Sequence, residues 1–213
     1  MHVKKKTKIQ IIGIIVIVIG IMIGIIPIFL KNNKVKEEKN KVENYINNTS
    51  TKQKEEDKEE VIEKHEEDKN IENVSDEEDY LLILEIPKIN FQRGVYSLNS
   101  KLNTIEKNVQ IMKESNLPYV EGGNLVLEAH NGTADIAYFR NLYKLENGDE
   151  AYIYFEGTKY TYVVSNIYDV SKDGDVEIYR DDDKTTLSLI TCKKNTKDRQ
   201  LVVILYLKDK EQY

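Results

Sequence analysis

From Tyr80 to its C-terminus the chain consists of short apolar runs separated by turn residues, and this pattern restricts the fold more than any other feature. Short runs of alternating or continuous apolar residues, bounded by Gly, Pro, Asn and Asp, are typical of β-strands. About seven or eight such runs occur. The predicted strands cover residues 81–86, 91–96, 125–130, 150–155, 160–164, 185–192 and 201–207.

Short strands in this number, with little helix between them, favour a mainly β domain folded as a closed or nearly closed eight-stranded barrel. One or two short helices are expected within it. Apolar residues at 98, 102, 105 and 109 recur at helical spacing, and residues 134–142 are long enough for one or two helical turns. The glycine in the sequence 156–159 between two alternating runs indicates a hairpin.

Residues 9–30 form an almost unbroken apolar run of isoleucine, valine and leucine. A run of about 20 residues matches the hydrocarbon core of a bilayer. Lysines stand just before it, and it lacks the short length and small-residue cleavage site of a cleaved signal peptide. We therefore predict a retained transmembrane signal anchor at 9–30, with residues 1–8 in the cytoplasm and the rest of the chain outside the cell.

Residues 31–79 are rich in Glu and Lys, and acidic residues outnumber basic ones. Their few apolar residues form no sustained heptad, so they bury too little surface to offset the entropy of ordering. We predict an acidic, extended extracellular tether over 31–79 and a folded domain over 80–213.

The composition excludes several classes of site. The formal net charge of -6 leaves no basic stripe for nucleic acid. A single cysteine rules out an internal disulfide framework and a multi-cysteine zinc site. His2 and His65 lie outside the predicted domain, so a histidine-based metal site is not expected either.

Three residues in the predicted domain are candidates for chemistry. Cys192 and His130 each end a predicted strand, where functional residues tend to gather, and Arg199 opens the last strand. A thiol that loses its proton is a nucleophile, an imidazole can transfer protons, and a guanidinium can hydrogen-bond an oxyanion. Together they suit acyl transfer. Each also has a structural interpretation: a buried thiol, a hydrogen-bonded strand-end histidine and a surface cation.

Strand alternation places Ser188, Ile190 and Cys192 on one face of their strand, and Leu187, Leu189 and Thr191 on the other. The second set is expected to face the core.

Five motifs resemble those of the sortase family, the membrane-anchored cysteine transpeptidases of Gram-positive cell surfaces. The segment 188–192 resembles the TLxTC signature, and Arg199 resembles the arginine that opens the following sortase strand. The other three motifs are the strand leading to the histidine at 127–130, the early IPKI strand at 84–89 and the Gly-Asp stretch at 142–149. They occur in the family's order across residues 80–213.

The resemblance implies an eight-stranded sortase-type β-barrel with Cys192 as nucleophile, His130 as acid and base, and Arg199 as oxyanion or substrate stabiliser. It implies cleavage of an LPxTG-like sorting signal on surface proteins through a thioacyl-enzyme, and transfer to a cell-wall precursor amine. Ser188, Ile190 and Thr191 are the predicted substrate-binding residues, with residues 169–185 as a wall of the groove.

The subclass prediction is class A- or D-like. Residues 169–185 are short for a class B helix, and neither a class C lid before Tyr80 nor a second membrane span is found. No cofactor or metal is predicted, and calcium activation stays open. A pilin-polymerising or hydrolytic sortase is one alternative. A non-catalytic, membrane-tethered adhesion or scaffold module is the other.

Overall fold

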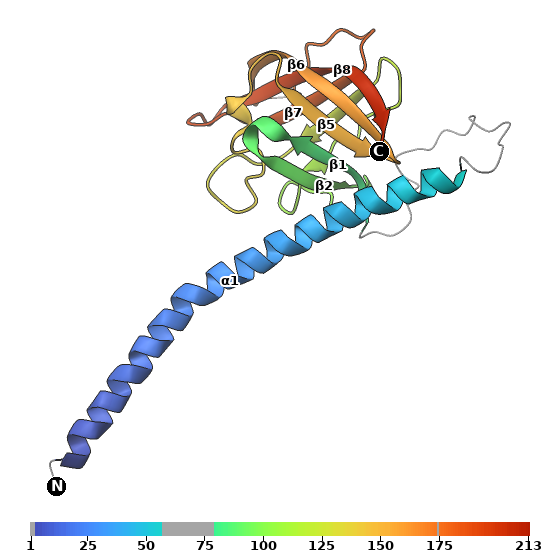
Figure 1. Cartoon of the computed structure of the whole chain (residues 1–213). Helices are drawn as coiled ribbons and strands as arrows, with labels where there is room; N and C mark the ends of the chain where they lie inside the picture. Colours follow the sequence, from blue (N-terminus) through green and yellow to red (C-terminus); the bar gives the residue numbers. More distant parts are fainter. Residues whose placement is uncertain (1–2, 57–78, 174) are drawn as a thin grey trace. The chain divides into compact units, whose positions relative to one another are not determined.

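The computed structural model describes residues 3–56, 79–173 and 175–213; within the long N-terminal helix it describes the side chains of residues 19–26, 28–30 and 32–50. Figure 1 shows a long helix and a strongly curved sheet. The elements are α1 (Val3–Glu56), β1 (Tyr80–Ile86), η1 (Pro87–Ile89), β2 (Phe91–Tyr96), β3 (Gln110–Ile111), β4 (Asn124–Glu128), η2 (Leu142–Lys144), β5 (Glu150–Phe155), β6 (Thr158–Ser171), β7 (Thr186–Cys192) and β8 (Arg199–Gln212).

The eight strands form a single sheet in the order β2-β1-β5-β6-β8-β7-β4-β3. All neighbours pair antiparallel except β4 and β7, which run parallel. The sheet curls until its two edge strands approach each other. Between these edges, the Asn108 side chain donates to the Gly94 carbonyl at 2.8 Å and accepts a hydrogen bond from Arg93. The prediction of a mainly β, nearly closed eight-stranded barrel is confirmed.

The barrel interior holds the main core, because alternate residues of every strand point inward. On β7, Leu187 and Leu189 are fully buried in this core, as the alternation predicts. The β5–β6 hairpin turns at Glu156 and Gly157, whose φ angles are 45° and 77°. Both central residues of such a tight turn need positive φ, which explains the glycine.

One predicted helix is absent. Residues 98–109 form turns instead. Asn103 accepts a hydrogen bond from the Ile111 backbone nitrogen at 2.8 Å and donates to the Ile111 carbonyl at 3.1 Å. Asparagine side chains that bond to the backbone in this way compete with helix formation. The short helices within the domain are the 3-10 turns η1 and η2.

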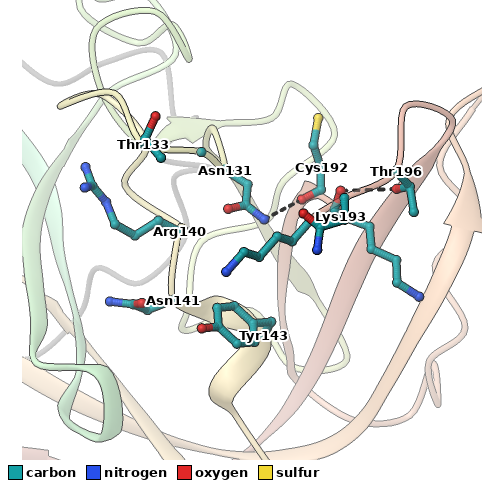
Figure 2. Close-up of a pocket in the computed structure, with 11 residues that line it drawn as sticks. Asn131, Thr133, Arg140, Asn141, Tyr143, Cys192, Lys193 and Thr196 are labelled. Atoms are coloured by element: carbon teal, nitrogen blue, oxygen red, sulfur yellow. Dashed lines mark hydrogen bonds between the residues drawn. The ribbon is translucent and has the colours of Figure 1, made fainter.

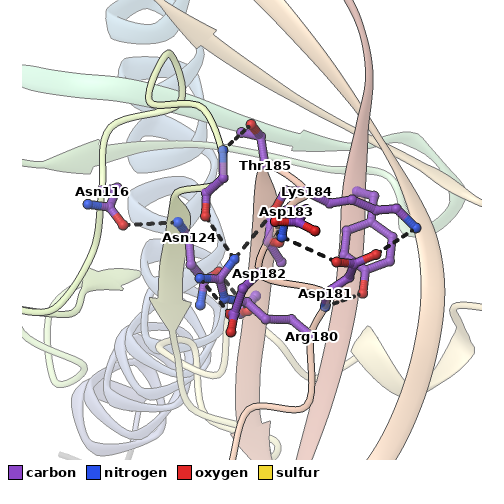
Figure 3. A network of polar contacts seen from close by, with 12 residues as sticks. Asn116, Asn124, Arg180, Asp181, Asp182, Asp183, Lys184 and Thr185 are labelled. Atoms are coloured by element: carbon purple, nitrogen blue, oxygen red, sulfur yellow. Dashed lines mark hydrogen bonds and ion pairs between the residues drawn. The ribbon is translucent and has the colours of Figure 1, made fainter.

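The connection between β6 and β7 is fastened at its end by the polar network of Figure 3. Arg180 donates to the Gly122 carbonyl at 2.9 Å and forms an ion pair with Asp182. Thr185 accepts a hydrogen bond from the Gly122 nitrogen at 3.2 Å. This network fixes the connection to the turn that precedes β4.

The chain divides into two compact units, residues 1–41 and 42–213, which we describe separately. α1 extends through 54 residues and contains the predicted membrane anchor at 9–30. No helix in the described part of the chain holds a stretch long and apolar enough to cross a bilayer. The side chains of residues 9–18 and 27 lie outside the described residues, so the anchor stays a prediction.

The expectation of an extended segment over 31–79 is wrong for residues 31–56, which continue α1. Glu and Lys are good helix formers. The C-terminal part of α1 also has apolar contacts with the barrel that the sequence pattern does not reveal. Residues 57–78 of the predicted tether lie outside the described residues.

The C-terminal part of α1 belongs to the same compact unit as the barrel. Val42 is buried in a small cluster with Tyr80, Ile83 and Tyr96. The Tyr45 hydroxyl donates to the Leu81 carbonyl at 2.8 Å. Burial raises the pKa of the Tyr45 hydroxyl far above its ordinary value. These contacts offset the entropy that an isolated helical segment would lose.

We predict that Tyr45→Phe lowers the free energy of unfolding by about 1 kcal/mol, because it leaves the buried Leu81 carbonyl without this partner. Urea unfolding followed by circular dichroism measures the effect. Tyr119→Phe is the matched control: Tyr119 is exposed and its hydroxyl has no hydrogen bond among the described residues. Equal stabilities of both variants and the parent would show that the helix contact contributes nothing.

Candidate active site

Cys192 is the last residue of β7 and is partly exposed. Its neighbour across the antiparallel β7–β8 ladder is Gln200. Cys192 lines an open pocket of about 530 Å³ (Figure 2). The ammonium nitrogen of Lys172, at the start of the β6–β7 connection, lies 3.7 Å from Sγ. The only thiol of the chain is therefore accessible and next to a cation.

His130 reaches the same edge of the sheet through the parallel pairing of β4 with β7. In this pairing Glu128 lies opposite Ile190. Two residues further along each chain stand His130 and Cys192. Neighbouring strands are about 4.8 Å apart, and paired residues present their side chains on the same face. β4 ends at Glu128, so His130 lies two residues beyond the paired strand, and the register directs it toward the end of β7 that carries Cys192. His130 does not line the pocket that contains Cys192.

Asn131 joins the two segments directly. Its side-chain nitrogen donates to the Cys192 carbonyl at 2.8 Å, as Figure 2 shows. The His130 carbonyl accepts a hydrogen bond from the Phe139 nitrogen at 3.1 Å. The loop after β4 is therefore held at both of these residues. Asn131 was not among the predicted site residues, although its position directly after His130 could have indicated a role at the site.

Glu128, the last residue of β4 and two residues before His130, is half-buried. Burial raises the pKa of its carboxyl, and the charges of His130 and Lys172 oppose that rise. Glu128 therefore interacts electrostatically with both His130 and Lys172. Lys172 was not predicted, because no sequence pattern connects it with Cys192 at the end of β7, 20 residues further along the chain.

Arg199 opens β8, as predicted, and pairs with Ser171 of β6. Its guanidinium is exposed and donates to the Asp169 carbonyl at 2.9 Å. The Lys193 nitrogen donates to the Arg199 carbonyl at 2.9 Å, so the two ends of the β7–β8 turn are joined. Arg199 does not line the pocket that contains Cys192. The structure places Arg199 near the end of β7, with its side chain on Asp169.

The three predicted substrate-binding residues are buried, and this prediction needs correction. Ser188 and Thr191 are fully buried; Ser188 donates to Asn124 at 2.9 Å and Thr191 to the Ala129 carbonyl at 2.7 Å. Ile190 is 2% exposed. Their hydroxyls satisfy neighbouring polar groups, and Ile190 fills a second apolar cluster. All three therefore act as packing residues here.

That second cluster lies on the face of the sheet that also carries Cys192. Its buried members are Val126, Val170, Ile190, Val202 and Ile204. Val176 and Ile178 of the β6–β7 connection pack against it. Sequence alternation identified this face correctly but did not show that the connection covers it.

The pocket itself is formed by residues 131–133 after β4, residues 140, 141 and 143 around η2, and residues 192–196. Three cations are among them: Arg140, Lys193 and Lys194. None of them was predicted, because the loops that carry them are far apart in sequence. Among the described residues, no group of three or more His, Cys, Asp or Glu side chains is placed to hold a metal ion.

Comparisons with known proteins agree with this arrangement. A family model for the Sortase domain matches residues 84–207. The chain is 27% identical to Sortase A of Bacillus anthracis over 117 residues, which are 54% of each protein. The match therefore spans about half the length of that curated relative.

Solved structures give the same result. Sortase A from Corynebacterium diphtheriae is 26% identical with a TM-score of 0.54, and the match covers 61% of each chain. Sortase C from Clostridium perfringens SM101 is 29% identical with a TM-score of 0.52, covering 63% of this chain and 72% of that one.

We predict that Thr191→Val lowers the free energy of unfolding by about 1–3 kcal/mol, because the buried Ala129 carbonyl loses its hydroxyl partner. Chemical unfolding of the variant and the parent measures this difference. Thr196→Val is the control. Its hydroxyl also donates to a carbonyl, that of Lys193 at 3.1 Å, but it is exposed, so we expect a change within about 0.5 kcal/mol. A neutral Thr191→Val would contradict the packing role.

The raised pKa of Glu128 predicts a pH dependence of stability. At pH values between its ordinary and raised pKa, the folded state keeps a proton that the unfolded state has lost. The free energy of unfolding therefore falls as pH rises through this interval. Glu128→Gln removes the titration, so the loss of stability between about pH 4 and about pH 7 becomes smaller. Urea unfolding at both pH values tests this.

Glu121→Gln serves as the control for this pH series, because Glu121 is an exposed carboxylate on the turn before β4. We expect it to leave the parent's pH dependence unchanged. Identical pH dependence in Glu128→Gln and the parent would refute the assignment.

Proposed function

Because this chain belongs to the sortase family, we propose that it is a cysteine transpeptidase with Cys192 as nucleophile and His130 as acid and base. The observation that supports the proposal is the parallel β4–β7 pairing, which runs to Glu128 opposite Ile190; His130 and Cys192 each follow two residues later. A nucleophile and a proton-transfer group in this relation support covalent acyl transfer.

In the proposed first half-reaction, the Cys192 thiolate attacks the Thr carbonyl carbon of an LPxTG-like sorting signal. Lys172, 3.7 Å from Sγ, interacts favourably with negative charge on the sulfur. His130 donates a proton to the leaving glycine nitrogen as the C–N bond breaks. The products are a thioacyl-enzyme and a free amine.

Arg199 is proposed to stabilise the oxyanion or orient the signal peptide. Its guanidinium is exposed. Among the described residues it donates a single hydrogen bond, to the backbone carbonyl of Asp169. A guanidinium has five donors, so further donors stay available for a substrate oxygen. The β6–β7 connection, which begins beside Lys172, is the proposed wall of the peptide groove.

We also propose the cellular setting. The apolar residues 9–30 serve as a single-pass membrane anchor, residues 1–8 lie in the cytoplasm, and residues 31–79 carry the catalytic domain away from the membrane on the extracellular side. The partners are surface proteins with LPxTG-like signals and a cell-wall precursor amine. The mechanism uses no cofactor and no nucleic acid. A class A- or D-like specificity remains our subclass hypothesis.

A pilin-polymerising or hydrolytic sortase is the second candidate. The similarity to Sortase C from Clostridium perfringens SM101 supports it, since that match reaches 29% identity. The acceptor distinguishes the candidates: a lysine side chain of a pilin, water, or a cell-wall amine.

Cleavage of an LPxTG peptide by Cys192→Ala and by the parent tests the function. We expect the variant to lose at least about a thousandfold in kcat/KM, because the nucleophile is gone. His130→Gln should lose activity as well, whereas His65→Gln, a control for histidine loss, should not. Cys192 is the only cysteine, so mass spectrometry of a trapped peptide adduct identifies the site without ambiguity.

Circular dichroism of each variant separates loss of chemistry from loss of fold. A folded Cys192→Ala variant that still cleaves the peptide would disprove the assignment of Cys192 as the nucleophile. A folded parent that neither cleaves nor forms an adduct with any LPxTG-like peptide would favour the non-catalytic adhesion or scaffold module.

A further inference from the structure

Cys192 faces two different groups of residues. Lys172, at the start of the β6–β7 connection, lies 3.7 Å from its sulfur. Cys192 also lines the pocket of about 530 Å³ formed by residues 131–133, 140, 141, 143 and 192–196. No described residue of the β6–β7 connection lines this pocket. If the signal peptide runs along the connection, the pocket is the open approach to the carbonyl carbon on Cys192.

The pocket is positively charged. Arg140, Lys193 and Lys194 line it, and no Asp or Glu does. Lys193 forms an ion pair with Asp169, which lies outside the lining. Arg140 and Lys194 have no carboxylate partner in the described part of the chain.

Both of these cations are held in place by other contacts. The Arg140 guanidinium donates to the carbonyls of Ala137 at 3.0 Å and Ala134 at 2.6 Å. The Lys194 ammonium lies 5.0 Å from the centroid of the Tyr143 ring. A cation fixed by backbone carbonyls or an aromatic face loses less side-chain entropy when an anion binds. Asn131, Asn141 and Thr196 add neutral hydrogen-bonding groups to the lining.

We propose that this pocket, which we call the acceptor pocket, binds the amine that attacks the thioacyl-enzyme, and that it selects amines bearing an anionic group. The anion is a carboxylate or a phosphate. This inference rests on the proposed function and adds the chemical class of the second substrate. Two cations that have no carboxylate partner among the described residues, in a pocket that Cys192 also lines, are the feature that carries it.

The acceptor pocket serves the second half-reaction. The neutral amine nitrogen attacks the carbonyl carbon of the thioacyl-enzyme, and an amide C–N bond forms. His130 accepts the proton that the nitrogen loses. The C–S bond breaks, and its electron pair leaves on Sγ of Cys192 as a thiolate. The anionic group of the amine takes no part in these bonds; it binds Arg140 and Lys194 and holds the nitrogen close to the carbonyl carbon.

Two pairs of acceptors test the selection and distinguish its sources. Glycylglycine and glycylglycinamide differ in a carboxylate, and O-phosphoethanolamine and ethanolamine differ in a phosphate. Transfer of an LPxTG peptide to each is measured as kcat/KM for the acceptor. We expect the anionic member of at least one pair to be preferred roughly tenfold, since two cations each contribute a factor of about two to five. If the preference occurs in only one pair, the anionic group of that pair, a carboxylate or a phosphate, is the one that the pocket selects.

Variants of two neighbouring lysines locate the effect. Lys194→Glu should reduce the preference by about five- to tenfold, because it replaces an attraction by a repulsion. Lys197→Glu is the matched control: Lys197 is an exposed lysine of the same β7–β8 turn that does not line the pocket. The two variants have the same net charge. An equal loss of preference in both would mean that the general field of the protein, and not the pocket, selects the acceptor.

A binding measurement keeps this inference separate from the proposed function. Backbone amide resonances of Asn195 and Thr196 are followed by NMR while the parent protein is titrated with the same four amines, without any peptide. We expect the anionic amines to shift these resonances in the parent protein. We expect no such shift with the neutral amines, and none when the anionic amines are added to Lys194→Glu. A parent that forms no acyl-enzyme would disprove the function while these shifts still test the pocket. Absent shifts, or equal shifts with the neutral amines, would overturn the acceptor pocket.

Discussion

β4 and β7 lie side by side and run in the same direction, the only parallel pair in a sheet that is otherwise antiparallel. Parallel strands end at the same edge of a sheet, so the residues that follow them meet there. Glu128 lies opposite Ile190, and His130 and Cys192 each follow two residues after this last pair. The Asn131 side chain then fixes the loop after β4 to the Cys192 carbonyl. A shift of one residue would turn His130 and Cys192 to opposite faces of the sheet.

The two faces of this sheet have different roles. The inner face fills the barrel, where side chains such as Leu187 and Leu189 are removed from water. The outer face around Ile190 is apolar as well, and Val176 and Ile178 cover it. Only the last residue of β7 is neither in the barrel interior nor covered by the β6–β7 connection. Cys192 is therefore the accessible residue of its strand. Reactivity is thus restricted to the strand end by burial of everything before it.

The helix contact shows how the folded unit extends beyond the barrel. α1 is charged and exposed over much of its described length, yet Val42 and Tyr45 pack on β1 and β2. A few apolar residues on one face of a helix are enough to hold it when a matching surface exists. That surface is formed by Tyr80, Ile83 and Tyr96, which are themselves distant from the active site in the strand order. The compact unit therefore begins at Val42.

The sequence by itself determined every strand except the two-residue β3, the alternation of β7 and the candidates Cys192 and His130. These follow from local patterns, because a strand has a period of two residues and a single cysteine has no competitor. Only the tertiary structure decided the neighbours of Cys192. Lys172, Arg140 and Lys194 come from loops far apart in the chain, and no local pattern encodes contacts between them. It also decided that Ser188, Ile190 and Thr191 are buried, because accessibility depends on what other segments cover. Local periodicity fixes the face on which a residue lies, whereas long-range packing fixes what that face meets.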